Sequence, residues 1–122
     1  MKKHILIVDD EVQIREILGQ CLEAQGFRVT STGTAIDAHR TVDTDPPDLL
    51  VSDLQLDESD GFELIAALKA KLPNLPVILL TGVLFDAETV RENLSQKVSS
   101  YIYKTTPLTR IVEEVRRLVG SS

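Results

Sequence analysis

The stretch that decides the fold is LLVSD, residues 49–53. Its first four residues are apolar or small and include the β-branched Val51, a composition typical of a strand buried on both faces. Asp53 follows directly, so the strand delivers a carboxylate to the edge of the core. Ligands of open parallel α/β sheets bind beyond the carboxyl ends of the strands. Asp53 is therefore a candidate functional residue.

Strand and helix patterns alternate along the rest of the chain. Short apolar runs predict further strands at residues 4–8, 27–31, 77–81 and 100–103. Apolar residues at helical spacing predict helices over residues 14–22, 35–42, 64–72, 86–96 and 108–119. This alternation favours an α/β fold, in which a five-stranded parallel sheet is covered by helices on both faces.

The composition limits the class of protein. A length of 122 residues with 43% hydrophobic residues predicts one domain over residues 1–122. The net charge of −6 argues against direct nucleic-acid binding and against attraction to an anionic membrane. Cys21 is the one cysteine, so no internal disulfide can form. No signal-peptide core and no apolar run near twenty residues is present, which predicts a cytoplasmic location.

Local signals also predict how three helices begin and pack. Asp10 followed by Gln13 is a capping-box pattern for the first helix. Thr106 followed by Pro107 is typical of an N-cap and a first-turn proline for the last helix. The helix expected over residues 86–96 has a narrow apolar stripe, which predicts light anchoring to the core.

Polar residues gather at the predicted carboxyl ends of four strands. All these ends lie on one edge of a parallel sheet, and the residues there are Asp9, Asp10, Asp53, Thr81 and Lys104. Three neighbouring carboxylates repel one another unless a divalent cation or the Lys104 ammonium offsets their charge. Oxygen ligands favour magnesium over zinc, for which the chain offers no cluster of Cys and His. The edge therefore predicts a magnesium site beside a lysine and a threonine hydroxyl.

These groups fit phosphoryl transfer to a carboxylate. An aspartate can act as the nucleophile and form an acyl phosphate, while a metal ion bridges it to the phosphoryl oxygens. Lysine and threonine are suited to the remaining oxygens. An ionised nucleophile needs no general base, so positioning and charge neutralisation supply the catalysis.

The whole chain resembles the receiver domain of two-component response regulators. The matching features, in chain order, are Asp9 and Asp10, Asp53, Gly61, Thr81 with Gly82, and Tyr101 three residues before Lys104. The order of all these motifs in one chain is far more specific than any one of them. The resemblance implies a flavodoxin-like doubly wound sheet with the strand order 2-1-3-4-5.

The resemblance also implies the roles of the site residues. Asp53 would accept a phosphoryl group from a sensor histidine kinase or a histidine phosphotransfer protein. Magnesium would be held by Asp10, Asp53 and the backbone carbonyl of Gln55, and Asp9 would orient it through water. Lys104 would bind the phosphoryl group.

Signalling would follow from a conformational change. The resemblance implies that Thr81 and Tyr101 move together as a switch, and that the readout is the face of the fourth helix, fifth strand and fifth helix. A downstream protein or output domain would read this face, and a phosphorylation-dependent dimer is compatible with it. The sequence does not identify the kinase, the stimulus or the output, and the chain is either a stand-alone receiver or a part of a longer protein.

The chain departs from the family pattern at two places. Thr105 follows Lys104 where receivers usually have a cis proline. Because a cis bond to a non-proline residue costs about 2.5 to 4 kcal/mol, we expect a trans bond here. The second departure is Asp57, with Glu58 next, at the position of the usual proline four residues after the phosphoacceptor. The added negative charge could strengthen metal binding or hinder the approach of the phosphodonor. The sequence leaves open which effect on phosphorylation is the larger.

Each residue at the strand ends also has an ordinary structural interpretation when it is taken alone. Asp10 can be a helix cap, Lys104 a solvated charge and Tyr101 a core aromatic. Two alternative functions remain for the whole chain: a receiver-like binding module that works without phosphorylation, and a small phosphatase with an aspartyl-phosphate intermediate. The preferred interpretation is a phosphorylatable signalling switch, which transfers a phosphoryl group to itself and is not a turnover enzyme.

Overall fold

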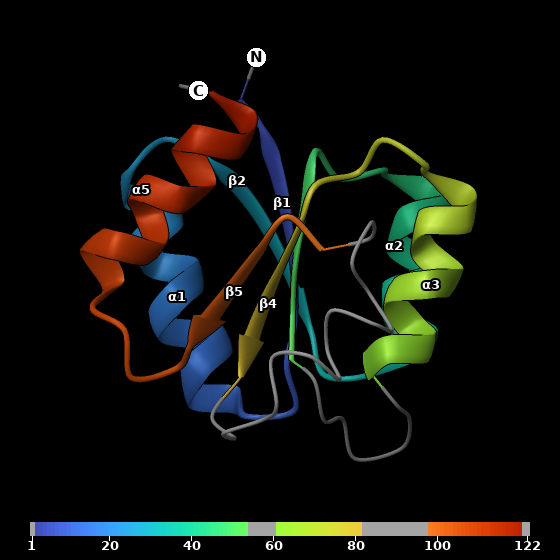
Figure 1. Ribbon diagram of the computed structural model, residues 1–122, viewed down its shortest axis with the longest axis horizontal. Helices are drawn as coiled ribbons and strands as arrows, with labels where there is room; N and C mark the ends of the chain where they lie inside the picture. Colours follow the sequence, from blue (N-terminus) through green and yellow to red (C-terminus); the bar gives the residue numbers. More distant parts are fainter. Residues whose placement is uncertain (1, 54–60, 82–97, 121–122) are drawn as a thin grey trace.

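A computed structural model describes residues 2–53, 61–81 and 98–120 of the chain (Figure 1). The described elements are β1 (His4–Val8), α1 (Val12–Ala24), β2 (Arg28–Thr32), α2 (Ala35–Thr44), β3 (Leu49–Ser52), α3 (Gly61–Lys71), β4 (Val77–Thr81), β5 (Ser100–Tyr103) and α5 (Leu108–Val119). The helix expected over residues 86–96 lies outside the described residues.

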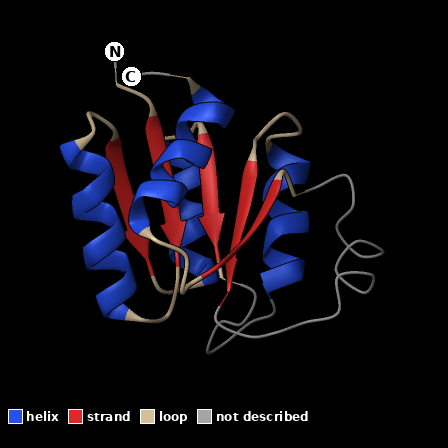
Figure 2. Ribbon diagram, turned by 60° about the vertical axis from the view of Figure 1, so that its left-hand side comes forward, coloured by secondary structure: helices blue, strands red, loops and turns tan. Residues whose placement is uncertain are grey.

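All five strands are parallel, and their order is β2-β1-β3-β4-β5. This confirms the predicted fold class and strand order. Figures 1 and 2 show α1 and α5 on one face of the sheet and α2 and α3 on the other. Val8 pairs with both Thr32 and Ser52, so β1, β2 and β3 end at the same level. The residues that follow these strands therefore meet at one edge of the sheet.

The core has two halves because successive strand residues point to opposite faces. In β1, Leu6 and Val8 pack in the half formed with α2 and α3, whereas Ile5 and Ile7 pack in the half formed with α1 and α5. Every residue of β1 and β3 is buried, as the continuous apolar runs predict for central strands. The site therefore stands on two interior strands that are buried along their whole length.

The connection between α1 and β2 shifts the predicted second strand by one residue. Gly26 adopts a left-handed backbone conformation with φ of 97° after the end of α1. The N–H of Phe27 then donates to the carbonyl of Leu22 at 3.1 Å, so Phe27 completes the helix-ending turn. The sheet ladder with β1 begins at Arg28. Phe27 remains in the core, where its side chain is buried.

Two predicted N-caps are wrong. The cap residue of α1 is Glu11, with no side-chain cap bond, and Asp9 Oδ1 accepts the N–H of Glu11 at 2.8 Å. Asp9 therefore makes the turn between β1 and α1, and the helix begins beyond it. The cap residue of α5 is Pro107, one residue beyond Thr106. The N–H of Thr106 donates to the carbonyl of Tyr103 at 2.9 Å, so Thr106 belongs to the turn before the helix.

The described residues contain no cis peptide bond, so the bond between Lys104 and Thr105 is trans, as predicted. Within the same residues, none of the helices combines the length and the apolar character needed to cross a bilayer.

Candidate functional site

The site is built at the carboxyl ends of the two central strands. Asp9 follows β1, and its N–H donates to the carbonyl of Thr32 at 3.0 Å. Asp53 follows β3, and its N–H donates to the carbonyl of Val8 at 2.9 Å. These bonds extend the sheet ladders by one residue and fix both backbones. The two acidic residues are buried, with 1% of Asp9 and 6% of Asp53 exposed.

Lys104 joins these acids from the end of β5. Its Nζ donates to Asp9 Oδ1 at 3.2 Å, to Asp53 Oδ2 at 3.1 Å and to Glu11 Oε1 at 2.7 Å. An ammonium has three N–H groups, so these three bonds account for its full donor capacity. Only 10% of the Lys104 side chain is exposed. Strands β1, β3 and β5 thus bring residues far apart in sequence into one ionic cluster.

Burial and charge shift two pKa values in this cluster. Burial raises the pKa of Asp9 above its ordinary value, and the hydrogen bonds from the Glu11 N–H and from Lys104 only partly oppose this effect. Burial works to lower the pKa of Lys104, but its bonds to Glu11, Asp9 and Asp53 outweigh burial and raise that pKa. Lys104 is therefore a firmly held cation at neutral pH.

The same acids fit a hard divalent cation. Asp9, Asp10, Glu11 and Asp53 each offer a carboxylate oxygen, and these oxygens lie within 4.8 Å of one another. Asp9 Oδ2 is buried and lies 3.0 Å from Lys104 Nζ, yet it accepts no hydrogen bond in the described part of the chain. A buried oxygen with spare acceptor capacity is suited to a metal ion or to its water. An all-oxygen set favours Mg²⁺ over zinc.

Comparison with known proteins agrees with this geometry. The sequence model described as "Response regulator receiver domain" matches residues 5–116. The chain belongs to the response regulator receiver domain family. Receiver domains of this family act in two-component signalling and bind Mg²⁺ at an acidic cluster. The clustered acids and Lys104 of this receiver chain lie where the strand order predicts them.

Relatives of known sequence and structure give the extent of the similarity. "Response regulator protein VraR" of Staphylococcus saprophyticus is 36% identical over 115 residues, which cover 93% of this chain and 54% of the relative. "Transcriptional regulatory protein GlrR" of Escherichia coli is 35% identical over 79 residues, which cover 65% of this chain and 18% of the relative. A CheY-like receiver domain protein from Methanospirillum hungatei superposes with a TM-score of 0.89 at 26% identity, and the match covers 96% of this chain and 93% of that one. The receiver chain therefore spans between 18% and 54% of the length of these two regulators.

The structure brings together four of the residues predicted at the strand ends. Asp9, Asp10 and Asp53 belong to the acidic cluster, and Lys104 binds two of them. Tyr101 lies on β5 and is 42% exposed, so its interpretation as a core aromatic is wrong.

The remaining predicted residues are described in part or not at all. Thr81 is the last residue of β4, and its side chain is outside the described part of the structure. Gln55, Asp57 and Glu58 lie outside the described residues.

Glu11 is the site residue that sequence reasoning missed. It makes the shortest of the three Lys104 bonds, although its own side chain is 58% exposed. Two signals could have found it: Glu11 is the third acid of an unbroken run after β1, and as the residue just before α1 it still lies at the edge of the sheet. Exposed acids near helix N-termini are common, so Glu11 taken alone does not indicate a site.

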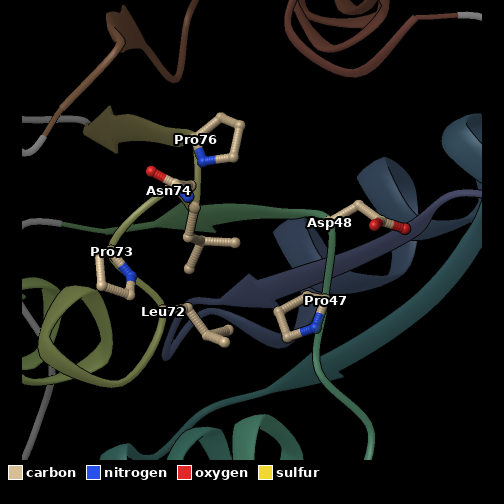
Figure 3. Close-up of a pocket in the computed structure, with 7 residues that line it drawn as sticks. Pro47, Asp48, Leu72, Pro73, Asn74 and Pro76 are labelled. Atoms are coloured by element: carbon tan, nitrogen blue, oxygen red, sulfur yellow. The ribbon is translucent and has the colours of Figure 1, made fainter.

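A second concave region lies at the opposite edge of the sheet, where β3 and β4 begin (Figure 3). Its volume is about 290 Å³, and its lining consists of Pro47, Asp48, Leu72, Pro73, Asn74, Leu75 and Pro76. Asp48 is the one ionisable residue of this lining, and its Oδ2 accepts the N–H of His4 at 2.8 Å. In Figure 3 its carboxylate points away from Leu72 and Pro73. The region therefore offers apolar contact and no counterpart of the acidic cluster.

Proposed function

We propose that this receiver chain is a phosphorylatable signalling switch whose phosphoacceptor is Asp53. The observation that carries the proposal is the position of Asp53: its Oδ2 lies 3.1 Å from Lys104 Nζ and within a cluster of four acids suited to Mg²⁺. Phosphoryl transfer to an aspartate requires three elements: a carboxylate nucleophile, a fixed cation and a metal site. The phosphodonor would be a phosphohistidine of a sensor kinase or of a histidine phosphotransfer protein.

The transfer step needs little covalent chemistry from the protein. An oxygen of Asp53 forms a bond to phosphorus, and the bond between phosphorus and the donor nitrogen breaks with its electron pair leaving on the donor. Bound Mg²⁺ would supply positive charge to the phosphoryl oxygens. Lys104, which already contacts Asp53, would donate to one of these oxygens as charge develops. Asp53 itself is the nucleophile, so no general base is required.

The other residues of the proposed site have separate roles. Asp10, Asp53 and the backbone carbonyl of Gln55 would bind the metal directly, and Asp9 would orient it through water. The burial of Asp9 and the spare acceptor capacity of its Oδ2 support a role beside the metal. Glu11 would hold Lys104 in the absence of a phosphoryl group.

The switch would use Thr81 and Tyr101. After phosphorylation, the Thr81 hydroxyl would move toward the phosphoryl group and the Tyr101 ring would turn inward. Tyr101 is 42% exposed in this structure, so an inward turn would remove apolar ring surface from water. The surface around β5 and α5 would carry the signal to a downstream protein, to an output domain, or to a second copy of the chain.

Residues 1–122 would form one cytoplasmic receiver domain that does not itself bind DNA. Receiver domains are signalling switches rather than turnover enzymes. Self-phosphorylation and slow hydrolysis of the acyl phosphate would be the only chemistry of this chain.

Acetyl phosphate provides the test. Incubation of the chain with acetyl phosphate and Mg²⁺ should add the mass of one phosphoryl group, and removal of Mg²⁺ with EDTA should prevent the addition. Asp53→Asn should abolish the adduct, whereas Asp37→Asn, which changes an exposed aspartate of α2, should leave it intact. A wild-type chain that forms no adduct, or an Asp53→Asn variant that still does, would overturn the proposal.

A further inference from the structure

Arg15 of α1 contacts the backbone of the acidic cluster. Its Nη1 donates to the carbonyl oxygen of Asp9 at 2.5 Å, and the side chain is half-buried. A bond from a charged donor to a neutral acceptor is among the stronger hydrogen bonds in proteins. The same Asp9 residue donates its own N–H to Thr32 at 3.0 Å. Both sides of Asp9 are therefore held, one by β2 and the other by Arg15.

Gly33 makes room for this contact. A Cβ atom built on Gly33 would lie 2.7 Å from Arg15 Nη1 and 3.5 Å from the Asp9 carbonyl oxygen. Real Cβ atoms essentially never come within 3.0 Å of another heavy atom, so any side chain at position 33 would displace the guanidinium. The turn after β2 thus has a glycine at the point where Arg15 crosses it.

We propose that Arg15 is a positioning residue: by fixing the Asp9 carbonyl across Gly33, it orients the Asp9–Glu11 turn that supplies three of the four clustered acids. This inference deepens the proposed function. The expected effect of Arg15 on Mg²⁺ binding rests on that function, whereas its effect on the turn does not. Asp9 Oδ1 accepts the N–H of Glu11 at 2.8 Å, so the orientation of the Asp9 backbone is transmitted directly to the turn. Outer contacts that orient metal ligands commonly alter metal affinity although they never touch the ion.

The charge of Arg15 and its positioning bond predict opposite changes in Mg²⁺ affinity when Arg15 is replaced. Removal of a cation near an acidic cluster should strengthen Mg²⁺ binding if charge alone matters. Loss of the orienting bond should weaken it. Arg40 is the matched charge control. It lines the same open surface pocket as Arg15 and Gly33, but its Nη1 donates to Asp37 on its own helix at 3.2 Å. Gly19 is the matched glycine control, since a Cβ there would meet Val29 at an ordinary 3.7 Å.

The experiment measures Mg²⁺ affinity by calorimetry and, in metal-free protein, hydrogen exchange of the Glu11 amide. In Arg15→Gln and in Gly33→Ala we expect roughly tenfold weaker Mg²⁺ binding and faster exchange at Glu11, with the amides of β1 unchanged. Arg40→Gln and Gly19→Ala should match the wild type. In the Arg15→Gln background, Gly33→Ala should add almost nothing, because its effect acts through Arg15.

Two results would overturn the inference. One is unchanged Glu11 exchange in both Arg15→Gln and Gly33→Ala. The other is Mg²⁺ binding that tightens equally in Arg15→Gln and Arg40→Gln, which would reduce Arg15 to its charge. A wild-type chain that binds no Mg²⁺ would contradict the proposed function, and the metal-free exchange of the Glu11 amide would still decide whether Arg15 positions the turn.

Discussion

Replacement of Lys104 by methionine should destabilise the metal-free protein. In the wild type, the Lys104 ammonium is the cation that binds Asp9, Asp53 and Glu11 together. Methionine keeps most of the apolar stem and removes the charge, so packing changes little. The variant would leave the acids of the cluster facing one another without that counter-charge.

The expected magnitude follows from the exposure of each partner. The side chains of Asp9 and Asp53 are 1% and 8% exposed, which places them among buried pairs, where removal of one partner costs about 3–5 kcal/mol. Glu11 is 58% exposed and contributes less than about 1 kcal/mol. Asp9 can relieve part of the cost by binding a proton, because burial already raises its pKa. We therefore expect a loss of about 3 kcal/mol near neutral pH.

Mg²⁺ and pH should both reduce this loss. Mg²⁺ would replace the missing positive charge and would bind only the folded chain, so it should stabilise the variant more than the wild type. A raised pKa means that folded Asp9 holds a proton more tightly than unfolded Asp9 does. The stability that this tighter proton binding contributes is fully present below the pKa of unfolded Asp9, near 3.8. It is lost as the pH rises through the pKa of folded Asp9. Acidification should therefore narrow the difference between the variant and the wild type.

Urea unfolding followed by circular dichroism, in EDTA and in Mg²⁺, measures these effects. Lys71→Met is the matched control, because Lys71 pairs with the exposed Asp43 on the surface and should cost less than about 1 kcal/mol. A Lys104→Met variant as stable as the wild type in EDTA would refute the reasoning. So would a loss that is the same with and without Mg²⁺.

Three further changes test other parts of the structure. Asp10→Asn should raise the free energy of unfolding in EDTA by about 1 kcal/mol by relieving repulsion, and it should abolish the stabilisation by Mg²⁺; a drop in stability in EDTA would contradict this. His4→Leu should cost about 1–3 kcal/mol in urea unfolding, because it removes the 2.7 Å bond between the buried ring and Thr30 Oγ1; an unchanged midpoint would exclude this contribution. Arg28→Met should raise the pKa of Asp45, which the Arg28 hydrogen bond now lowers, and a carboxyl NMR titration with no shift would count against that bond.

The fold was largely predictable because its central strands are unbroken apolar runs. LLVSD and the run at residues 4–8 are buried throughout, and a strand buried on both faces leaves this pattern in the sequence. Which strands lie side by side was harder to predict from the sequence. The order 2-1-3-4-5 came from the family resemblance, since apolar runs do not specify which strand lies beside which.

The site was predictable as a set of residue types and less so as a set of contacts. Parallel strands deliver Asp9, Asp53 and Lys104 to one edge, and the geometry follows from topology. The capping prediction is wrong at α1 because the helix begins one residue later than expected. Asp9 accepts the Glu11 amide in the turn after β1, and Glu11 rather than Asp10 is the cap residue. Arg15 was missed because its proposed role depends on Gly33, which is distant in sequence. Only the folded sheet brings Gly33 next to the Arg15 guanidinium.

Chemical mapping of the phosphorylated residue is the most direct test of the central claim. The acyl phosphate formed with acetyl phosphate and Mg²⁺ can be reduced by borohydride, which converts the modified aspartate to homoserine. Peptide mass spectrometry should then find homoserine at position 53 and an unaltered aspartate at positions 9 and 10. Homoserine at another position, or its absence throughout the phosphorylated sample, would contradict the assignment of Asp53 as the phosphoacceptor.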